Sequence, residues 1–409
     1  MTEILKFEVL RHAIAGHAAA FRCRRRLQPV GGEGDKVFPP TFAGAVYAIE
    51  KRRVKDREDP VSGVLLDSVQ SQANRMELAL QEAVDAGQAK MPLVEVDFSE
   101  HDPTGDLEAD LEAKRLIDAV GKITSLQVPH RLADAILRDS ELDGKPFRHS
   151  EKGKALNTVS LANATPLLEL CPTALLFGMW DSTGPKGGLG PKFERAVVSE
   201  IVGIGAEYHD DYRARGVRRD PLEISKNVPV TRNEDKSLHK VVDGKEKGAV
   251  RPSEINHSSV PFDSTNSGVT IEYAEQVTTL SLIALRRLHF PVNGGRSDDA
   301  DHAARAVLAA LGLCAATLAF ENGVGLRSRS LLWPDGPMTW ELLEKPGQAP
   351  RMFELTCEQA LELLNEAVEA ATDASLNWPE DPVPLKPSAQ LLELVRRSQN
   401  MARQEGAQE

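Results

Sequence analysis

The sequence lacks the features of a membrane, secreted or disulfide-bonded protein. Within its 409 residues no apolar run approaches the ~20 residues of a membrane helix, and Glu3 and Lys6 interrupt the apolar N-terminus, unlike a signal peptide. The cysteines have no C-x-x-C spacing and no histidine at ligand spacing, so neither a zinc site nor a disulfide framework is expected. We predict a cytoplasmic protein with no membrane partner, no cofactor and four reduced core thiols: Cys23, Cys171, Cys314 and Cys357.

Signatures of catalysis are also missing. The ten histidines are dispersed, and no H-E-x-x-H, paired-acid or Ser-His-Asp pattern occurs. The compact group His209, Asp210 and Asp211 lies in a loop-like stretch, where a solvated cluster is the better interpretation. We therefore predict a protein that is not an enzyme and has no catalytic or metal-binding residues.

An excess of positive charge is missing overall but present locally. The formal net charge is −12, yet residues 1–60 carry 12 Lys and Arg against 8 Asp and Glu, while residues 350–409 carry 5 against 11. A chain that sorts its charges this way can present a basic groove within an acidic exterior. The alternative is an acidic protein with no nucleic-acid partner.

What is present begins with a glycine-rich basic loop in residues 175–201, LLFGMWDSTGPKGGLGPKFERAVVSEI. Predicted strands at 175–179 and 196–204 enclose it. Glycines let the backbone approach a ligand closely, and cations favour phosphate. The loop has no P-loop spacing, so a nucleotide-hydrolysing cradle is not indicated, and an ordinary Gly/Pro hairpin is the alternative. The residues concerned are Gly184, Lys186, Gly187, Gly188, Gly190, Lys192 and Arg195, opposed by Glu194.

A second pattern is an amide-rich helix predicted over 65–84. Gln70 and Asn74 lie one turn apart with Arg75 beside them, opposite an apolar stripe. Amides could bind ribose hydroxyls or base edges, and Arg75 could reach a phosphate. A solvated helix face or an internal hydrogen-bond network is the alternative.

A third pattern is a run of arginines followed by a glycine loop. If the segment is extended, Arg22, Arg24 and Arg26 share one face, which makes a second candidate phosphate contact. A solvated edge strand is the alternative. The residues are Arg22, Arg24, Arg25, Arg26, Gly31, Gly32, Gly34 and Lys36, and weaker candidates are Arg138, Phe147, Arg148 and Lys152.

Three of these segments together resemble one family: residues 24–42 (RRRLQPVGGEGDKVFPPTF), residues 65–80 (LLDSVQSQANRMELAL) and the glycine-rich loop. They resemble the backbone subunit of type I-G (formerly I-U) CRISPR interference complexes, of the Cas-seven group in the RAMP superfamily. Residues 138–150 and 275–291 extend the resemblance.

The resemblance implies a non-catalytic subunit in antiviral defence. Several copies would form a helical filament on CRISPR guide RNA (crRNA), beside the other subunits of a Cascade interference complex, and present the guide for pairing with target DNA. The RNA-binding residues predicted on this basis are Arg24, Arg25, Arg26, Lys36, Gln70, Asn74, Arg75, Arg148, Lys186, Gly187, Gly188, Lys192 and Arg195.

The order of strands and long helices predicts an α+β fold. The resemblance implies a modified RNA-recognition-motif (ferredoxin-like) palm with helical finger insertions, a thumb hairpin and a C-terminal helical extension. We expect the palm and its insertions in 1–355, a flexible or thumb insertion at 208–266, and the extension at 356–409. A long helix is predicted at 299–320 with Asp298 or Asp299 near its cap, and a proline-spaced linker at 379–387.

Two other functions stay open at this point. The first is a RAMP-type endoribonuclease, because some RAMP relatives cut RNA with a loop aspartate and Asp181 adjoins the glycine-rich loop. We do not extend that role to Asp181, since the type I-G resemblance implies a scaffold. The second is a small-molecule phosphate-binding enzyme.

Overall fold

The computed structural model describes residues 3–43, 46–55, 57–184, 187–207, 222, 224–225, 227–232, 239–243, 248–255 and 268–405. The chain divides into two compact units. The first comprises Met1–Asp102, Ala119–Glu207 and Val269–Leu392, and the second Pro103–Asp118, Tyr208–Gly268 and Glu393–Glu409. The fold is a mixture of helices and several sheets, which confirms the predicted α+β class.

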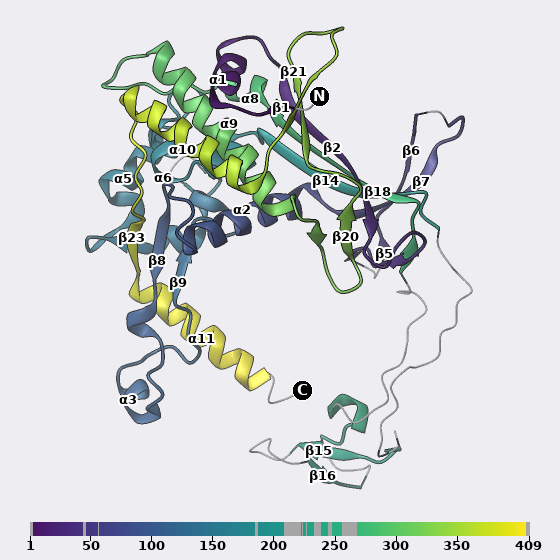
Figure 1. Cartoon of the computed structure of the whole chain (residues 1–409). Helices are drawn as coiled ribbons and strands as arrows, with labels where there is room; N and C mark the ends of the chain where they lie inside the picture. Colours follow the sequence, from purple (N-terminus) through teal and green to yellow (C-terminus); the bar gives the residue numbers. More distant parts are fainter. Residues whose placement is uncertain are drawn as a thin grey trace. The chain divides into compact units, whose positions relative to one another are not determined.

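A large sheet forms the centre of the first unit. Its strands are β1 (Glu3–Ile4), β2 (Ala20–Pro29), β6 (Ile49–Arg52), β7 (Val61–Asp67), β14 (Val197–Ile204), β18 (Tyr273–Ser281), β19 (Val324–Gly325), β20 (Leu331–Pro334), β21 (Thr339–Leu343) and β22 (Arg351–Glu354). They follow the order β1-β22-β21-β2-β18-β14-β7-β6, with β20 pairing both β2 and β19. Apart from the parallel β1–β22 pair, neighbours run antiparallel. Strands β2, β18 and β14 lie side by side (Figure 1).

Strand β2 shows why the arginine run is extended. Cys23, Arg25 and Leu27 are buried, whereas Arg24 and Arg26 are exposed. This alternation has the two-residue period of a strand with one face against a core, as predicted for the segment. The outer face of the sheet, as we call the face away from helix α9 (Asp298–Phe320), therefore carries Arg24 and Arg26.

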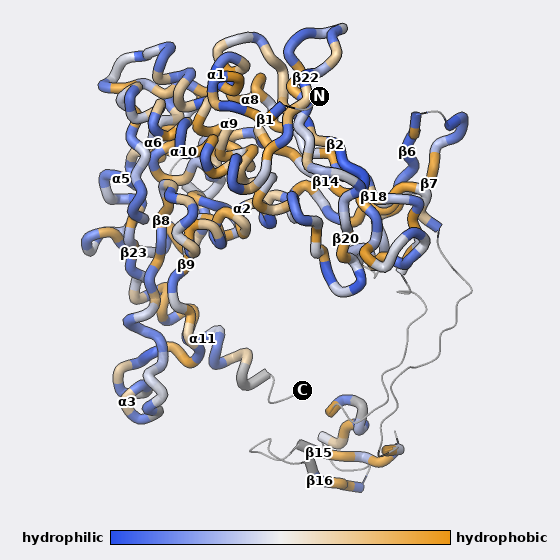
Figure 2. The backbone as a smooth tube through the Cα atoms, viewed as in Figure 1, coloured by the Kyte–Doolittle hydropathy of each residue, from blue (hydrophilic) through white to orange (hydrophobic). Residues whose placement is uncertain are grey.

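Helix α9 is the core helix of the first unit. It is apolar on almost every side, and its residues from Ala304 to Thr317 are buried against the sheet and the surrounding helices. Figure 2 shows the hydrophobic colour gathered around α1 and α9. The predicted helix is confirmed, with Asp298 and Asp299 in its first turn beside the cap. The capping residue is Ser297, whose side chain accepts a hydrogen bond from the backbone N–H of Ala300.

Other helices pack around α9 and along the same unit. Helices α1, α2, α8 and α10 contact α9, and α2 also packs on β14. Their bounds, with those of the shorter helices, are α1 (Phe7–Ala15), α2 (Val69–Asp85), α4 (Ala135–Arg138), α5 (Glu151–Ala155), α6 (Thr165–Leu170), α7 (Thr173–Phe177), α8 (Leu282–Arg286) and α10 (Cys357–Asp373).

A smaller sheet and three short ribbons complete the first unit. The smaller sheet has the order β11-β10-β23-β8-β9, and the ribbons pair β12 with β13, β3 with β17 and β4 with β5. The bounds are β3 (Lys36–Val37), β4 (Thr41–Phe42), β5 (Val46–Tyr47), β8 (Val94–Asp97), β9 (Lys122–Thr124), β10 (Ser140–Leu142), β11 (Lys145–Pro146), β12 (Met179–Trp180), β13 (Lys192–Phe193), β17 (Val269–Thr270) and β23 (Val383–Pro387). The predicted linker at 379–387 is thus partly a strand, because Val383 and Leu385 are buried where β23 pairs with β8.

Two predicted boundaries are also wrong. Residues 175–179 were predicted as a strand, but most of them belong to α7, and only Met179 enters a strand. A short apolar run has no periodicity that separates a buried helix from a buried strand. The amide-rich helix begins at Val69 and not at Leu65, because Leu65 lies in β7 and Ser68 caps the helix.

The second unit contains α3 (Leu107–Glu112), the paired strands β15 (Val230–Arg232) and β16 (His239–Val241), and most of α11 (Ala389–Glu405). Much of the predicted insertion at 208–266, including His209, Asp210 and Asp211, lies outside the described residues.

Two expectations about the core have mixed outcomes. Among the described helices, α9 is long and apolar enough to cross a membrane by length and composition, contrary to the expectation of no such segment, but 83% of its apolar window is buried inside the unit, as in a core helix. The predicted core thiols are confirmed for Cys23, Cys171 and Cys314, which are free and buried, while Cys357 is half-buried. Burial raises the pKa of Cys23 and of Cys314 to about 12, so both stay protonated.

Candidate nucleic-acid interface

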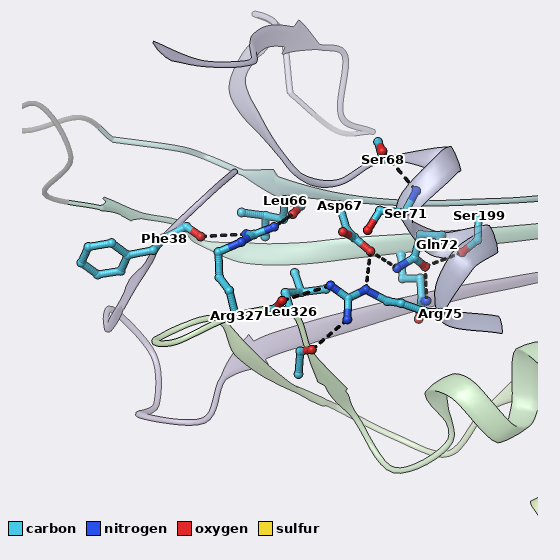
Figure 3. Close-up of polar contacts among 12 residues, drawn as sticks. Phe38, Leu66, Asp67, Ser68, Ser71, Gln72, Arg75, Ser199, Leu326 and Arg327 are labelled. Carbon is cyan, nitrogen blue, oxygen red and sulfur yellow. Dashed lines mark hydrogen bonds and ion pairs between the residues drawn. The ribbon is translucent and has the colours of Figure 1, made fainter. Parts of the chain in front are cut away.

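A buried polar network fixes the start of helix α2 against the large sheet. Gln72 donates to Asp67 and accepts from Ser199 and from Gln276, which lie on β14 and β18 (Figure 3). Asp67, Gln72, Ser199 and Gln276 are all almost fully buried. Buried polar groups are tolerated only when they are hydrogen-bonded, and these groups find their partners only when α2 lies in this position. The network therefore fixes the position of α2 on the sheet. An internal hydrogen-bond network was one alternative predicted for this helix, but the sequence did not distinguish Gln72 from its neighbouring amides.

Arg75 belongs to the same network and not to an open face. Its guanidinium contacts Asp67 at 2.9 Å and donates to the carbonyls of Gly325 and Leu326 at 3.0 Å each (Figure 3). Arg327 ties the same loop to the carbonyls of Phe38 and Leu66. Arg75 is therefore a weaker candidate for a phosphate contact than an exposed, unpaired cation, since it already makes three bonds inside the unit.

The other two residues of the amide-rich face do face solvent. Gln70 and Asn74 are exposed, and Leu78, one turn further along α2, is 54% exposed. These three residues form one row at a spacing of four, which leaves an uncharged exposed stripe on the helix.

The glycine-rich loop connects the two strands of the β12–β13 ribbon. Met179 pairs with Phe193 and Trp180 with Lys192. Met179 and Phe193 are buried, whereas Trp180 is 52% exposed and Lys192 is exposed. Successive residues of a strand point to opposite sides, so burial of the inner pair directs Trp180 and Lys192 outward together. The ammonium of Lys192 lies 5.4 Å from the centre of a Trp180 ring.

Arg131 holds this ribbon next to α2. Its guanidinium forms two bonds with the carboxylate of Glu77 on α2, at 2.6 and 2.7 Å, and donates to the carbonyl of Gly178 at 2.9 Å. Gly178 has a φ of +84°, a value that favours glycine, where the chain turns from α7 into β12. Arg131 could not be identified from the sequence, because it lies in a segment without a recognisable motif.

These elements enclose a groove of about 700 Å³, which we call the ribbon groove. Its lining residues come from the ribbon, from the start of α2, from the segment around His130 and from β14; the ones that matter here are Val69, His130, Trp180, Lys192, Arg195 and Val198. Strand β7 pairs with β14 only at Ile201–Ile204, so the groove lies where β14 continues beyond its β7 partner.

Two cations of the ribbon groove, Lys192 and Arg195, have no carboxylate partner among the residues described, whereas Arg131 is paired with Glu77. Lys192 and Arg195 are exposed and form no ion pair there. Glu194, the acid expected to oppose them, pairs instead with Arg287 at 2.6 Å. The groove therefore carries uncompensated positive charge beside an exposed aromatic ring, which is the combination that binds single-stranded nucleic acid.

The outer face of the sheet leads from this groove to the predicted arginines. Val198 pairs with Thr279, and Thr279 pairs with Arg22, so the three residues form one row across β14, β18 and β2. Neighbouring strands are about 4.8 Å apart, so Arg22 and Val198 are roughly 10 Å apart along this row. Two segments that were predicted separately are thus brought onto one surface.

The arginines of this face are already paired, unlike the groove cations. Arg22 pairs with Glu341 at 2.5 Å and Arg24 with Glu275 at 2.6 Å. Arg26 lies over the ring of Tyr273, 4.3 Å from its centre. A phosphate would have to displace a carboxylate from Arg22 or Arg24, so these residues are weaker candidates than Lys192 and Arg195.

Arg25 is corrected from a phosphate contact to a structural residue. It is 5% exposed, and it donates to the carbonyls of Phe320 at 2.5 Å and Glu321 at 3.3 Å, at the C-terminus of α9. A cation there satisfies carbonyls that the helix leaves free and complements the helix dipole. Burial lowers the pKa of Arg25 from its ordinary value, without making it available to a ligand.

Arg148 is likewise directed into the protein. Its guanidinium lies 3.0 Å from the carboxylate of Asp181, and both side chains are almost fully buried. Gly190 packs so closely on Asp181 that a Cβ at Gly190 would lie 1.9 Å from the Asp181 carbonyl oxygen. The Arg148–Asp181 pair therefore supports the glycine-rich loop from the protein interior. Neither side chain is accessible to RNA.

The remaining predicted residues have separate positions. Gly187 and Gly188 lie in a short 3-10 turn, Gly187–Leu189, where added Cβ atoms would meet nothing within 4 Å. Lys36 is half-buried in β3. Lys186 lies outside the described residues. Within the part of the chain that the structure describes, no group of three or more His, Cys, Asp or Glu side chains could hold a metal ion.

Comparison with known proteins bears on this surface. The family described as CRISPR-associated protein GSU0053 matches residues 21–208, which include β2, α2 and the ribbon groove's loop. Residues 21–208, a little less than half of the chain, are thus similar to a CRISPR-associated family. This match confirms the predicted resemblance at the level of a CRISPR-associated protein, and all three segments that carry the resemblance lie within it.

The other comparisons add little. The crystal structure of Csc2 from Thermofilum pendens aligns over 98% of this chain and 91% of that chain, with 11% identity and a TM-score of 0.27, which is too low to support an argument. No curated protein matches the chain.

Proposed function

We propose that this chain is a non-catalytic, RNA-binding backbone subunit of a type I-G CRISPR interference complex in the cytoplasm. The observation that carries the proposal is the CRISPR-associated family match over residues 21–208, which spans the ribbon groove and the arginine strand. Several copies would bind along one guide RNA and present its bases to target DNA, so sequence would be recognised by base pairing and affinity would come from phosphate contacts.

The same proposal assigns parts of the fold. The large sheet with its packed helices would be the palm, in residues 1–355, and the insertion at 208–266 would form the thumb that contacts the next subunit. Residues 356–409 would be the C-terminal extension. The RNA would follow the ribbon groove and the outer face of the sheet, past the exposed stripe of Gln70 and Asn74 on α2.

RNA-dependent assembly tests the proposal directly. The protein, co-expressed with its guide RNA, is measured by mass photometry before and after nuclease treatment. We expect multimers with bound RNA that fall to monomers once the RNA is digested. A mass that nuclease does not change, with no nucleic acid in the preparation, would contradict the proposal.

The groove itself is tested with a charge-matched pair of variants. Lys192→Ala with Arg195→Ala should weaken binding similarly for unrelated RNA sequences, and the salt dependence should fall by about 0.7 per lost phosphate contact. The control is Lys90→Ala with Lys386→Ala, which removes two positive charges that pair with Glu380 and Glu100 away from the groove. Equal weakening by both variants would show a net-charge effect and not a site.

A further inference from the structure

Trp180 is an exposed indole whose position the ribbon fixes. The pairing of Met179 with Phe193 buries the inner side of the ribbon and leaves Trp180 52% exposed on its outer side. A tryptophan normally contributes to stability by burying its large apolar surface, and here half of that surface is left in solvent. A single exposed apolar side chain is common, so exposure alone assigns no role.

The surroundings of Trp180 distinguish it from other exposed side chains. Trp333 is 58% exposed, but no cation lies over its ring in the described structure, and it does not line the ribbon groove. Trp180 lines that groove together with Lys192, Arg195 and His130. Lys192 stands directly across the ribbon from it, with the ammonium 5.4 Å from a ring centre.

We propose that Trp180 is the stacking platform for one unpaired base of the bound RNA, with Lys192 as the cation for the adjoining phosphate. This inference rests on the proposed function and adds to it the residue that holds a base. Every base has a π-face, so stacking on an indole tolerates any sequence, as a subunit that binds variable guides requires. On binding, the ammonium of Lys192 would move from the indole ring to the phosphate and neutralise its charge. The ring face that Lys192 covered would then be free to stack on the base.

A photocrosslinking experiment locates the contact. Single-stranded RNA of about 10 nucleotides, within the site size of such grooves, carries 5-iodouridine at one position at a time. We expect irradiation to link one position of the RNA to the peptide that contains Trp180, as identified by mass spectrometry. Crosslinks confined to other peptides would overturn the proposal.

Affinity measurements separate stacking from general apolar contact. Trp180→Leu should weaken binding of the single strand roughly 5- to 150-fold, the range for one stacked base, while Trp180→Phe should retain most of the affinity. The control is Leu161→Ala, which trims an apolar side chain that is 47% exposed, lies outside the large sheet and does not line the ribbon groove; this variant should bind like the parent. The weakening by Trp180→Leu should disappear with RNA that is abasic at the crosslinked nucleotide.

The possible failures are distinguishable. If Trp180→Leu binds like the parent while the Lys192→Ala, Arg195→Ala variant is weakened, the stacking inference is wrong and the proposed function stands. Equal losses in Trp180→Leu and Leu161→Ala would also overturn the inference. If the parent protein binds no RNA at all, both the inference and the proposed function are overturned.

Discussion

Neighbouring arginines on β2 have opposite roles because a strand alternates its faces. Arg25 is held at the C-terminus of α9, while Arg24 and Arg26 lie on the outer face of the sheet. The composition of the segment is uniform, so only the two-residue period separates them. That period was visible in the sequence for Arg22, Arg24 and Arg26, but the helix end that needs Arg25 comes from a segment almost 300 residues away.

This division predicts different effects for two alanine variants. Arg25→Ala should lower the free energy of unfolding by roughly 1.5–3 kcal/mol, because it removes charged hydrogen bonds to buried carbonyls. Arg24→Ala removes an exposed side chain and should change stability by no more than about 0.5 kcal/mol. Urea unfolding of both variants measures the difference. Equal stability of Arg25→Ala and the parent would mean that Arg25 does not cap α9.

At the scale of elements, the sequence predicted periodic segments well and short apolar runs poorly. Helix α9 and strand β14 were found because their patterns are long. Helix α7 was mistaken for a strand, and β23 for a linker, because each segment has only five residues, too few repeats to distinguish a helical from a strand periodicity. The choice between helix and strand there is made by packing against distant elements.

The candidate site divides in the same way. The exposure of Lys192, Gln70 and Asn74 could be predicted from local pattern, whereas the internal bonds of Arg75 and Arg148 could not. Those two arginines bind partners brought close by the fold alone. Trp180 was missed because no motif marks it and it directly follows the run at 175–179 that was interpreted as a buried strand.

A further prediction concerns helix α2, which has two polar faces. One face is exposed and carries Gln70 and Asn74, and the other is buried and carries Gln72. Gln70→Ala with Asn74→Ala should leave monomer stability nearly unchanged, because both side chains are exposed. Assembly on guide RNA should nevertheless suffer if this face contacts RNA or the neighbouring subunit, and electron microscopy should show shorter filaments. The contrasting variant is Gln72→Ala, which should lower stability by leaving Asp67 and Ser199 short of partners. Filaments of normal length in the Gln70→Ala, Asn74→Ala variant would show that this face contacts only solvent.

For the whole molecule, an acidic chain can bind a polyanion because its charges are sorted. The net charge is −12, and most surface arginines described here are paired with carboxylates, as on the outer face of the sheet. Lys192 and Arg195 remain uncompensated in the ribbon groove. The net negative charge of the chain therefore repels RNA, whereas Lys192 and Arg195 attract it to the ribbon groove. This contrast favours binding at one defined position over indiscriminate binding. The same arrangement makes the binding sensitive to salt.

The last prediction concerns cleavage, for which Asp181 is the decisive residue. Its carboxylate is buried and lies 3.0 Å from Arg148, so it is not placed to bind a metal ion or a ribose hydroxyl in the groove. We expect labelled RNA to remain intact with the purified protein, with or without Mg²⁺. Asp181→Ala should instead lower the melting temperature, since it leaves Arg148 buried without its counter-charge, and Arg148→Met in the same chain should restore part of the loss. The opposite result would be that the parent protein cuts bound RNA at regular intervals and a folded Asp181→Asn variant does not. That result would contradict the scaffold function and identify the protein as a ribonuclease.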